Sequence, residues 1–249
     1  KDLKDGVIRA IGHPGSRIEE DYLRMLRAVR FAARFNFTIE PATLGAVQEN
    51  ASHISQVSRE RIREELFKTF GGPNGLRGLA LLKETNLLAT LFPGNWTHAE
   101  NQFPVALTAA KEFPEGNPLL FFTLLLKDME QQSAEDFTRD LTFSNGDRKI
   151  LLAMLNGLSE LEKLSLDNIA AVKRFVRQDC WKQLRYVVGG LQATGLLGGP
   201  DLATLEELQA QWSRDDLWPE PFLRGSDLKS LGLQPGPRFK TLISALETL

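Results

Sequence analysis

The sequence predicts an all-α protein built as an irregular array of helices. Apolar residues recur every three or four positions through most of the 249 residues, as in RERIREELFKTF, PLLFFTLLLKDM and RKILLAMLNGL. Clusters of glycine and proline interrupt this pattern, as at residues 71–73 and 116–118, and separate about ten to twelve helices. No fixed period links these segments, which favours an irregular array over a helical repeat protein.

Composition indicates a globular chain without a strong global charge. Hydrophobic residues make up 42% of the chain, and the formal net charge is −2, so attraction to nucleic acid requires a local basic patch. The single cysteine, Cys180, excludes an intrachain disulfide and a cysteine-based zinc site. No apolar run approaches the roughly 18 to 20 residues that span a bilayer. We therefore expect a cytoplasmic protein with no membrane partner.

The ordered elements begin with GVIRAIG, residues 6–12, which reads as a short strand with nothing before it to pair with. The apolar pattern then predicts one helix in the segment from Glu19 to Phe37, and further helices after Pro41 and after Ser58. Two glycine pairs, at 189–190 and 198–199, lack the context of a phosphate-binding loop and are predicted to mark helix ends and turns.

Four arginines of the predicted helix at Glu19 to Phe37 share an arc of roughly 120°: Arg24, Arg27, Arg30 and Arg34. Glu20 precedes Arg24 by one turn and can orient its guanidinium, while Asp21 lies three residues before Arg24. A carboxylate beside a guanidinium can read the edge of a base, because the first accepts from an exocyclic amine and the second donates to a ring nitrogen or carbonyl. The alternative is a solvated helix face with ordinary salt bridges.

The segment GVIRAIGHPGSRIEEDYLRMLRAVRFAARFNFTIEPAT, followed by SRERIREEL, closely resembles the neck of class II tRNA nucleotidyltransferases and bacterial poly(A) polymerases. In that family a Glu-Asp-x-x-Arg motif is a protein template that pairs with incoming CTP or ATP. The resemblance implies that Asp21 and Arg24 contact the base, that Glu20 holds Arg24, and that Arg27 and Arg30 lie near the nucleotide and its triphosphate.

The SRERIREEL helix resembles the neck helix that buttresses the template helix. We predict its arginines to form an ordinary exposed, salt-bridged face: Arg59, Arg61 and Arg63. The chain departs from the family at His13, where relatives usually carry aspartate, and at Ile18, where they commonly carry an aromatic residue.

The resemblance also implies a two-metal reaction in which carboxylates of an N-terminal α/β head domain hold Mg²⁺. Nothing in residues 1–249 matches that motif, so we expect no catalytic residue here, an N-terminal strand left over from the missing head, and no activity of this chain alone. The implied partners are the head domain, a nucleoside triphosphate and the 3′ end of tRNA or another RNA. The expected divisions are 1–12 for the head remnant, 13–85 for the neck, 86–165 for the body, and 166–249 for the body and tail.

Two downstream segments resemble other parts of the family. NWTHAENQ and LLFFTLLLKDM are similar to an HD-type phosphohydrolase region, in which His98 and Asp128 persist but Lys127 replaces the paired histidine. A protonated lysine cannot ligate a metal, so we predict a degenerate scaffold with no metal site. FLRGSDLKSLGLQPGPRFKTLISAL, residues 222–246, resembles a tail element that either approaches tRNA or serves as a structural turn.

The leading hypothesis is therefore the nucleotide-selecting and RNA-binding part of an RNA 3′-end nucleotidyltransferase. Three alternatives stay open: a non-catalytic helical RNA-binding module, a relic of an HD-type phosphohydrolase, and a helical scaffold for protein partners. The sequence leaves open addition of CCA, of CC, of the terminal A, or of a poly(A) tail, since all of these share the template motif.

Overall fold

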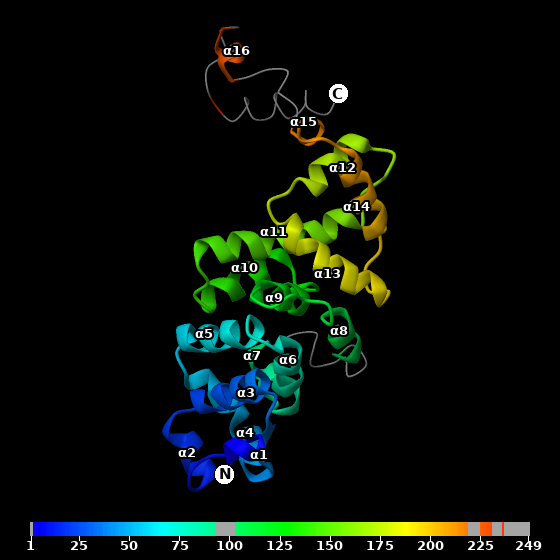
Figure 1. Cartoon of the computed structure of the whole chain (residues 1–249). Coiled ribbons are helices and arrows are strands. Elements are labelled where there is room, and N and C mark those ends of the chain that lie inside the picture. Colours follow the sequence, from blue (N-terminus) through cyan, green and yellow to red (C-terminus); the bar gives the residue numbers. More distant parts are fainter. Residues whose placement is uncertain (1, 93–102, 219–224, 231–235, 237–249) are drawn as a thin grey trace.

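The computed structural model of this chain describes residues 2–92, 103–218, 225–230 and 236 (Figure 1). Helices form nearly all of the regular structure in these residues, and the single sheet among them consists of two strands of two residues each. The predicted all-α irregular array is confirmed. No helix of the described part is long and apolar enough to cross a membrane.

The first half of the chain contains these elements: α1 (Asp2–Asp5), β1 (Val7–Ile8), α2 (Pro14–Glu20), α3 (Leu23–Phe35), β2 (Thr38–Ile39), α4 (Pro41–Asn50), the 3-10 helix η1 (Ala51–Gln56), α5 (Arg59–Phe70), α6 (Gly75–Glu84), α7 (Leu87–Leu91) and α8 (Phe103–Ala109). The second half contains α9 (Pro118–Leu126), α10 (Gln131–Asp140), α11 (Asn145–Leu161), α12 (Ile169–Val176), α13 (Trp181–Ala193), α14 (Leu202–Gln211), α15 (Arg214–Leu217) and α16 (Gly225–Ser230). Figure 1 shows them following one another along an elongated molecule, from α1–α7 through α9–α11 to α12–α15.

The described residues hold more helices than the expected ten to twelve, because local turns divide long apolar segments. The predicted helix at Glu19 to Phe37 is in fact two helices, since Asp21 adopts an extended conformation (φ −158°, ψ 101°) between α2 and α3. Asn86 has a left-handed conformation (φ 61°) and separates α6 from α7 in the same way.

The N-terminal strand has a partner inside this chain, which corrects the expectation of an unpaired strand. β1 pairs in parallel with β2, with Val7 opposite Thr38 and Ile8 opposite Ile39. Asn36, in the left-handed conformation (φ 54°), ends α3 and directs the chain back toward β1. Asparagine tolerates that conformation better than most residues. The sequence pattern missed this partner because two residues are too short for an alternating signal.

The core joins the two halves of the chain through α3, α5 and α9. The buried face of α3 packs on α5 and α6, and α5 in turn contacts α9. Residues 119–126 of α9 are all buried, so this helix is apolar on every side. Phe70 of α5 stacks on Phe121 of α9, with ring centroids 4.9 Å apart. The buried face of α3 is therefore supported by α5, which in turn rests on α9.

One glycine pair was predicted wrongly. Gly189 and Gly190 lie inside α13 rather than at a helix end. A Cβ atom on Gly190 would overlap the carbonyl oxygen of Ala109, the last residue of α8. Close approach of two helices therefore requires the glycine here. At the second pair, Gly199 does lie in a turn, with φ +92°.

Candidate functional site

Two side chains bind backbone N–H groups near the starts of α2 and α3. Pro14 occupies the first turn of α2, and Nδ1 of His13 accepts a hydrogen bond from the backbone N–H of Ser16 at 3.4 Å. The histidine thus supplies the cap acceptor at a position where the related family usually has aspartate. At the other end of α2, the Asp21 carboxylate accepts from the N–H of Leu23, the first residue of α3, at 3.2 Å.

Glu20 holds Arg24, as the spacing predicts. Nη1 of Arg24 donates to Oε2 of Glu20 at 2.6 Å and also to the carbonyl oxygen of Arg17. The Arg17 side chain donates to the same carboxylate oxygen at 2.6 Å. The Arg24 hydrogen bond is the main reason that the pKa of Glu20 lies below its ordinary value; desolvation opposes this shift and Arg17 adds to it. Among the described residues, Nε and Nη2 of Arg24 have no hydrogen-bond partner, so they can meet a ligand.

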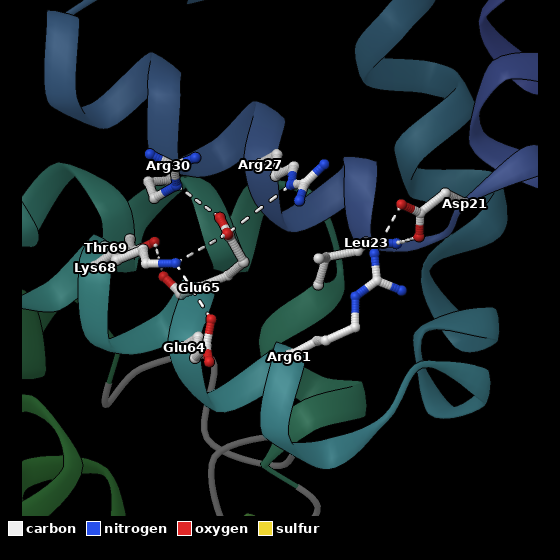
Figure 2. A network of polar contacts seen from close by, with 9 residues as sticks. All are labelled: Asp21, Leu23, Arg27, Arg30, Arg61, Glu64, Glu65, Lys68 and Thr69. Atoms are coloured by element: carbon white, nitrogen blue, oxygen red, sulfur yellow. Dashed lines mark hydrogen bonds and ion pairs between the residues drawn. The ribbon is translucent and has the colours of Figure 1, made fainter.

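Asp21 does not lie against the Arg24 side chain but is paired with α5. Oδ2 of Asp21 accepts from Nη2 of Arg61 at 2.9 Å, as Figure 2 shows. Partial burial raises the pKa of Asp21, but the hydrogen bonds from Arg61 and Leu23 outweigh it, so the pKa lies below its ordinary value. Asp21 is therefore ionised at neutral pH. Arg61 is exposed and salt-bridged, as predicted, and its partner is a predicted site residue.

The buried carboxylate of Glu65, on α5, binds Arg30 and lies near Arg27. Nε of Arg30 donates to Oε2 of Glu65 at 2.6 Å, and Nε of Arg27 lies 3.9 Å from Oε1 (Figure 2). The Arg30 and Glu65 side chains are 13% and 5% exposed, whereas Arg27 is 46% exposed. Lys68 approaches Glu65 from the same helix at 3.7 Å. Arg30 is thus held inward and Arg27 remains accessible.

Sequence reasoning missed Glu65, although a signal was present. Residues 62, 65, 66 and 69 share one stripe of α5 by helical spacing, and the other three are isoleucine, leucine and threonine. A carboxylate on an apolar stripe needs a buried cationic partner. That requirement pointed to a contact with an arginine of another helix.

A pocket of about 280 Å³ opens between the loop after β1, α2, α3 and α4. Four arginine residues are part of its lining: Arg9, Arg17, Arg24 and Arg27. The rest of the lining is mostly apolar and includes Ile18, Phe31 and Val47, and no carboxylate is among the described residues that line it. Such a pocket suits an anionic ligand that also carries a flat apolar part.

The five predicted site residues thus divide into two groups. Arg24 and Arg27 line the pocket, and Glu20 holds Arg24 there. Asp21 and Arg30 are turned toward α5, where Arg61 and Glu65 bind them, and they do not line the pocket. Arg34 is exposed near the end of α3.

The two downstream predictions fall partly outside the described residues. Nζ of Lys127 pairs with both carboxylate oxygens of its neighbour Asp128 at 2.7 Å. His98 lies outside the described residues, and so does most of the tail element, residues 231–235 and 237–246 included. In the part of the chain that the structure describes, no three His, Cys, Asp or Glu side chains gather to hold a metal.

Comparisons with known proteins identify relatives of this chain. The model of a protein family described as "Probable RNA and SrmB- binding site of polymerase A" matches residues 36–97. The chain is 31% identical over 255 residues to the CCA-adding enzyme of Levilactobacillus brevis, with 99% of this chain and 60% of that protein covered. Poly(A) polymerase I of Escherichia coli O6:H1 is 44% identical over 93 residues, which are 37% of this chain and 20% of that protein.

The fold is also that of solved relatives. A structure described as "The complex structure of CCA-adding enzyme with ATP" superposes with a TM-score of 0.64 at 20% identity, covering 99% of this chain and 59% of that chain. The relatives that these comparisons identify are nucleotidyltransferases. More narrowly, the chain belongs to the family of class II tRNA nucleotidyltransferases (CCA-adding enzymes) and bacterial poly(A) polymerases. It spans about three fifths of the length of the Levilactobacillus brevis relative.

Proposed function

We propose that this chain selects the nucleotide and binds the RNA in an RNA 3′-end nucleotidyltransferase, which adds CCA or its terminal A to tRNA or makes a poly(A) tail. One observation carries the proposal: Glu20 fixes Arg24 on the wall of a cationic pocket and leaves two of its nitrogens unoccupied by described residues. The names of the curated relatives, CCA-adding enzyme and poly(A) polymerase, are consistent with this function.

Selection follows from the hydrogen-bonding capacity of two side chains. Arg24 can only donate, so it suits a ring nitrogen or carbonyl oxygen of the base. Asp21 is ionised and can only accept, so it suits the exocyclic amine of cytosine or adenine. Guanine and uracil present a carbonyl oxygen in place of that amine, and two acceptors facing each other repel. The pair therefore favours CTP and ATP over GTP and UTP.

Asp21 performs this role while Arg61 keeps it in place. An ionised carboxylate has about four acceptor positions, of which Leu23 and Arg61 take two. The base amine takes a third as the nucleotide enters across the junction of α2 and α3. Arg61 thus keeps the carboxylate charged and oriented without blocking it.

The phosphates are assigned to Arg27. Its guanidinium is 46% exposed, lines the pocket, and has a single distant ion pair to Glu65 among the described residues. A guanidinium in that state can bind phosphate oxygens with two parallel hydrogen bonds. The Arg30 side chain, in contrast, is largely buried and donates a hydrogen bond to Glu65. We therefore assign Arg30 to holding α3 in place rather than to contacting the triphosphate.

Among the described residues, no three His, Cys, Asp or Glu side chains gather to hold a metal ion, which supports placing the Mg²⁺ ions of this chemistry elsewhere. We infer that metal binding and the transfer step belong to other residues of the complete enzyme. Absence of transfer activity in residues 1–249 alone remains a prediction of this proposal.

Nucleotide binding by the 249-residue chain and its Arg24→Ala variant tests the proposal. Fluorescent analogues of CTP, ATP, GTP and UTP are titrated, with Arg139→Ala on α10 as control, because Arg139 is exposed and pairs only with Glu135 and Asp136 among the described residues. We expect Arg24→Ala to lose the preference for CTP and ATP and Arg139→Ala to keep it. If Arg24→Ala still prefers CTP and ATP over GTP and UTP, the assignment of Arg24 to the base-reading template is wrong.

A non-catalytic RNA-binding module is the second candidate, favoured by the family description that names an RNA-binding site over residues 36–97. It predicts RNA affinity that falls steeply with salt and no discrimination among nucleotides by the wild-type chain. The same titrations, repeated with RNA at several salt concentrations, separate the two candidates.

A further inference from the structure

Three phenylalanine rings form a continuous ladder from the pocket to the end of α3. Phe31 and Phe35 lie one turn apart with parallel rings, their centroids 6.1 Å apart at an interplanar angle of 6°. Phe35 contacts Phe37, with centroids 5.7 Å apart. Phe31 is 36% exposed and Phe35 is 50% exposed. We call these three residues the phenylalanine ladder.

Guanidinium groups accompany the ladder along its length. The guanidinium of Arg30 lies 4.0 Å from the ring centroid of Phe31, and that of Arg34 lies 5.8 Å from the centroid of Phe35. Arg77 of α6 donates through Nη2 to the carbonyl oxygen of Phe37 at 2.9 Å. Glu65 neutralises Arg30, but neither Arg34 nor Arg77 has a carboxylate partner among the described residues. Arg34 therefore carries an uncompensated positive charge beside the exposed ring of Phe35, whereas Arg77 is held at the backbone of Phe37 with its Nε atom buried.

This arrangement is not explained by packing of the core. Burial of the Phe35 ring would be favourable, yet the ring stays half exposed on a helix whose opposite face is packed on α5 and α6. The ladder also extends beyond the nucleotide pocket, because Phe31 lines that pocket while Phe35 and Phe37 do not. The rings beyond the pocket are thus available for a second ligand.

We propose that the phenylalanine ladder is a stacking platform for the unpaired bases of a single-stranded RNA end, with Arg34 binding its phosphates. Exposed aromatic rings stack on bases irrespective of sequence, and guanidinium groups beside them neutralise the phosphates. Single-stranded nucleic acids offer flat apolar faces and a regular negative charge together, and the description of the matched family model names RNA. Because the ladder begins at Phe31 in the pocket wall, the strand reaches the nucleotide along α3. This inference deepens the proposed function and rests on it.

The test measures binding of two labelled RNAs to the 249-residue chain at one fixed salt concentration. One RNA is a hairpin with an unpaired 3′ overhang, and the other is the same hairpin with a blunt end. Phe35→Leu keeps the apolar contact with Phe37 but removes the ring, so we expect an affinity loss of about five-fold or more for the overhang RNA and none for the blunt one. Phe35→Trp restores a ring and should restore the affinity.

Two further variants complete the design. Leu166→Ser changes an exposed leucine, 38% accessible, between α11 and α12, and we expect it to leave both affinities unchanged. Arg34→Gln should weaken binding of the overhang RNA and reduce the slope of affinity against salt by about one. Equal affinities of wild type and Phe35→Leu for the overhang RNA would overturn the proposal. If Phe35→Leu instead impaired binding of another domain of the enzyme, the ladder would be a protein contact and the proposal would also fail.

These outcomes are separate from the nucleotide test. Phe35 does not line the pocket, so Phe35→Leu should discriminate among nucleotides as the wild type does. Loss of RNA affinity with retained discrimination supports the ladder. Loss of discrimination in Arg24→Ala with unchanged overhang binding supports the template independently.

Discussion

Glu65 accepts a hydrogen bond from Arg30 at 2.6 Å in a place where water scarcely reaches either side chain. The pair connects α5 to α3, and Arg27, which lines the pocket, lies 3.9 Å from the same carboxylate. A charge buried in this way is costly unless its partner is present. The contact therefore fixes the position of α3 relative to its support, and through it the wall of the pocket.

Removing Glu65 should destabilise the protein far more than removing its neighbour Glu64. Glu65→Ala leaves Arg30 buried without an acceptor, and we expect a loss of about 3 to 5 kcal/mol in the free energy of unfolding. Glu64 is 57% exposed and pairs only with Lys68 among the described residues, so Glu64→Ala should cost less than about 0.5 kcal/mol. Urea unfolding followed by circular dichroism measures both. Similar losses for the two variants would contradict the anchoring role of Glu65.

The ion pair of Arg61 with Asp21 should appear as a dependence of stability on pH. The folded-state pKa of Asp21 is depressed, so its contribution is present above the ordinary pKa of about 3.9 and is lost as pH falls through the folded value. Arg61→Met removes the strongest cause of the depression. The free energies of unfolding of wild type and variant should therefore differ at neutral pH and converge below about pH 4.

Unfolding experiments from neutral to acid pH test this convergence. Arg61→Lys serves as the control, because it keeps the charge and should follow the wild-type curve more closely. A difference between wild type and Arg61→Met that stays constant down to low pH would mean that Arg61 stabilises the fold by packing alone.

The sequence predicted the contacts that depend on short spacing and missed those that depend on packing. Glu20 meets Arg24 because the two are four residues apart, and the contact forms even though the helix breaks between them. The partners of Asp21 and Arg30 lie 40 and 35 residues further along the chain. Which long side chain meets which carboxylate is decided by how α5 packs on α3, and no local pattern contains that information.

The same distinction applies to the fold. Helical periodicity predicted most of α3 to α13, because these segments carry apolar residues at helical spacing on the face that becomes buried. It failed for β1, because a two-residue strand has no period and its partner β2 follows a separate helix. It failed again for Gly189 and Gly190, where the glycine serves contact with another helix rather than a local turn.

Replacing His13 by aspartate should stabilise the N-terminus of α2. His13 caps this helix through Nδ1 at 3.4 Å from the Ser16 nitrogen, a long hydrogen bond. An aspartate carboxylate is a better cap acceptor and interacts favourably with the helix dipole, so His13→Asp should raise the free energy of unfolding by about 0.5 to 1 kcal/mol. His13→Ala removes the cap and should lower it. Thermal unfolding of the three proteins at pH 7 gives the order, and a wild type more stable than His13→Asp would contradict it.

Two adjacent glycines of α13 provide a matched pair for the close approach of α13 to α8. Alanine is favoured over glycine inside a helix by about 1 kcal/mol, so both Gly189→Ala and Gly190→Ala gain the same intrinsic term. Their surroundings differ, because the new methyl group at 189 would meet the end of the Leu202 side chain at 2.9 Å, whereas at 190 it would overlap the backbone oxygen of Ala109.

A leucine side chain can change rotamer at small cost, but a backbone carbonyl at the end of α8 moves only if the two helices separate. We therefore expect Gly189→Ala to be neutral or stabilising by up to about 1 kcal/mol, and Gly190→Ala to lose about 1 to 3 kcal/mol. Urea unfolding of both variants measures the difference. Equal stability of the two would show that α8 and α13 are not held together at Gly190, and that the glycine pair has no packing role.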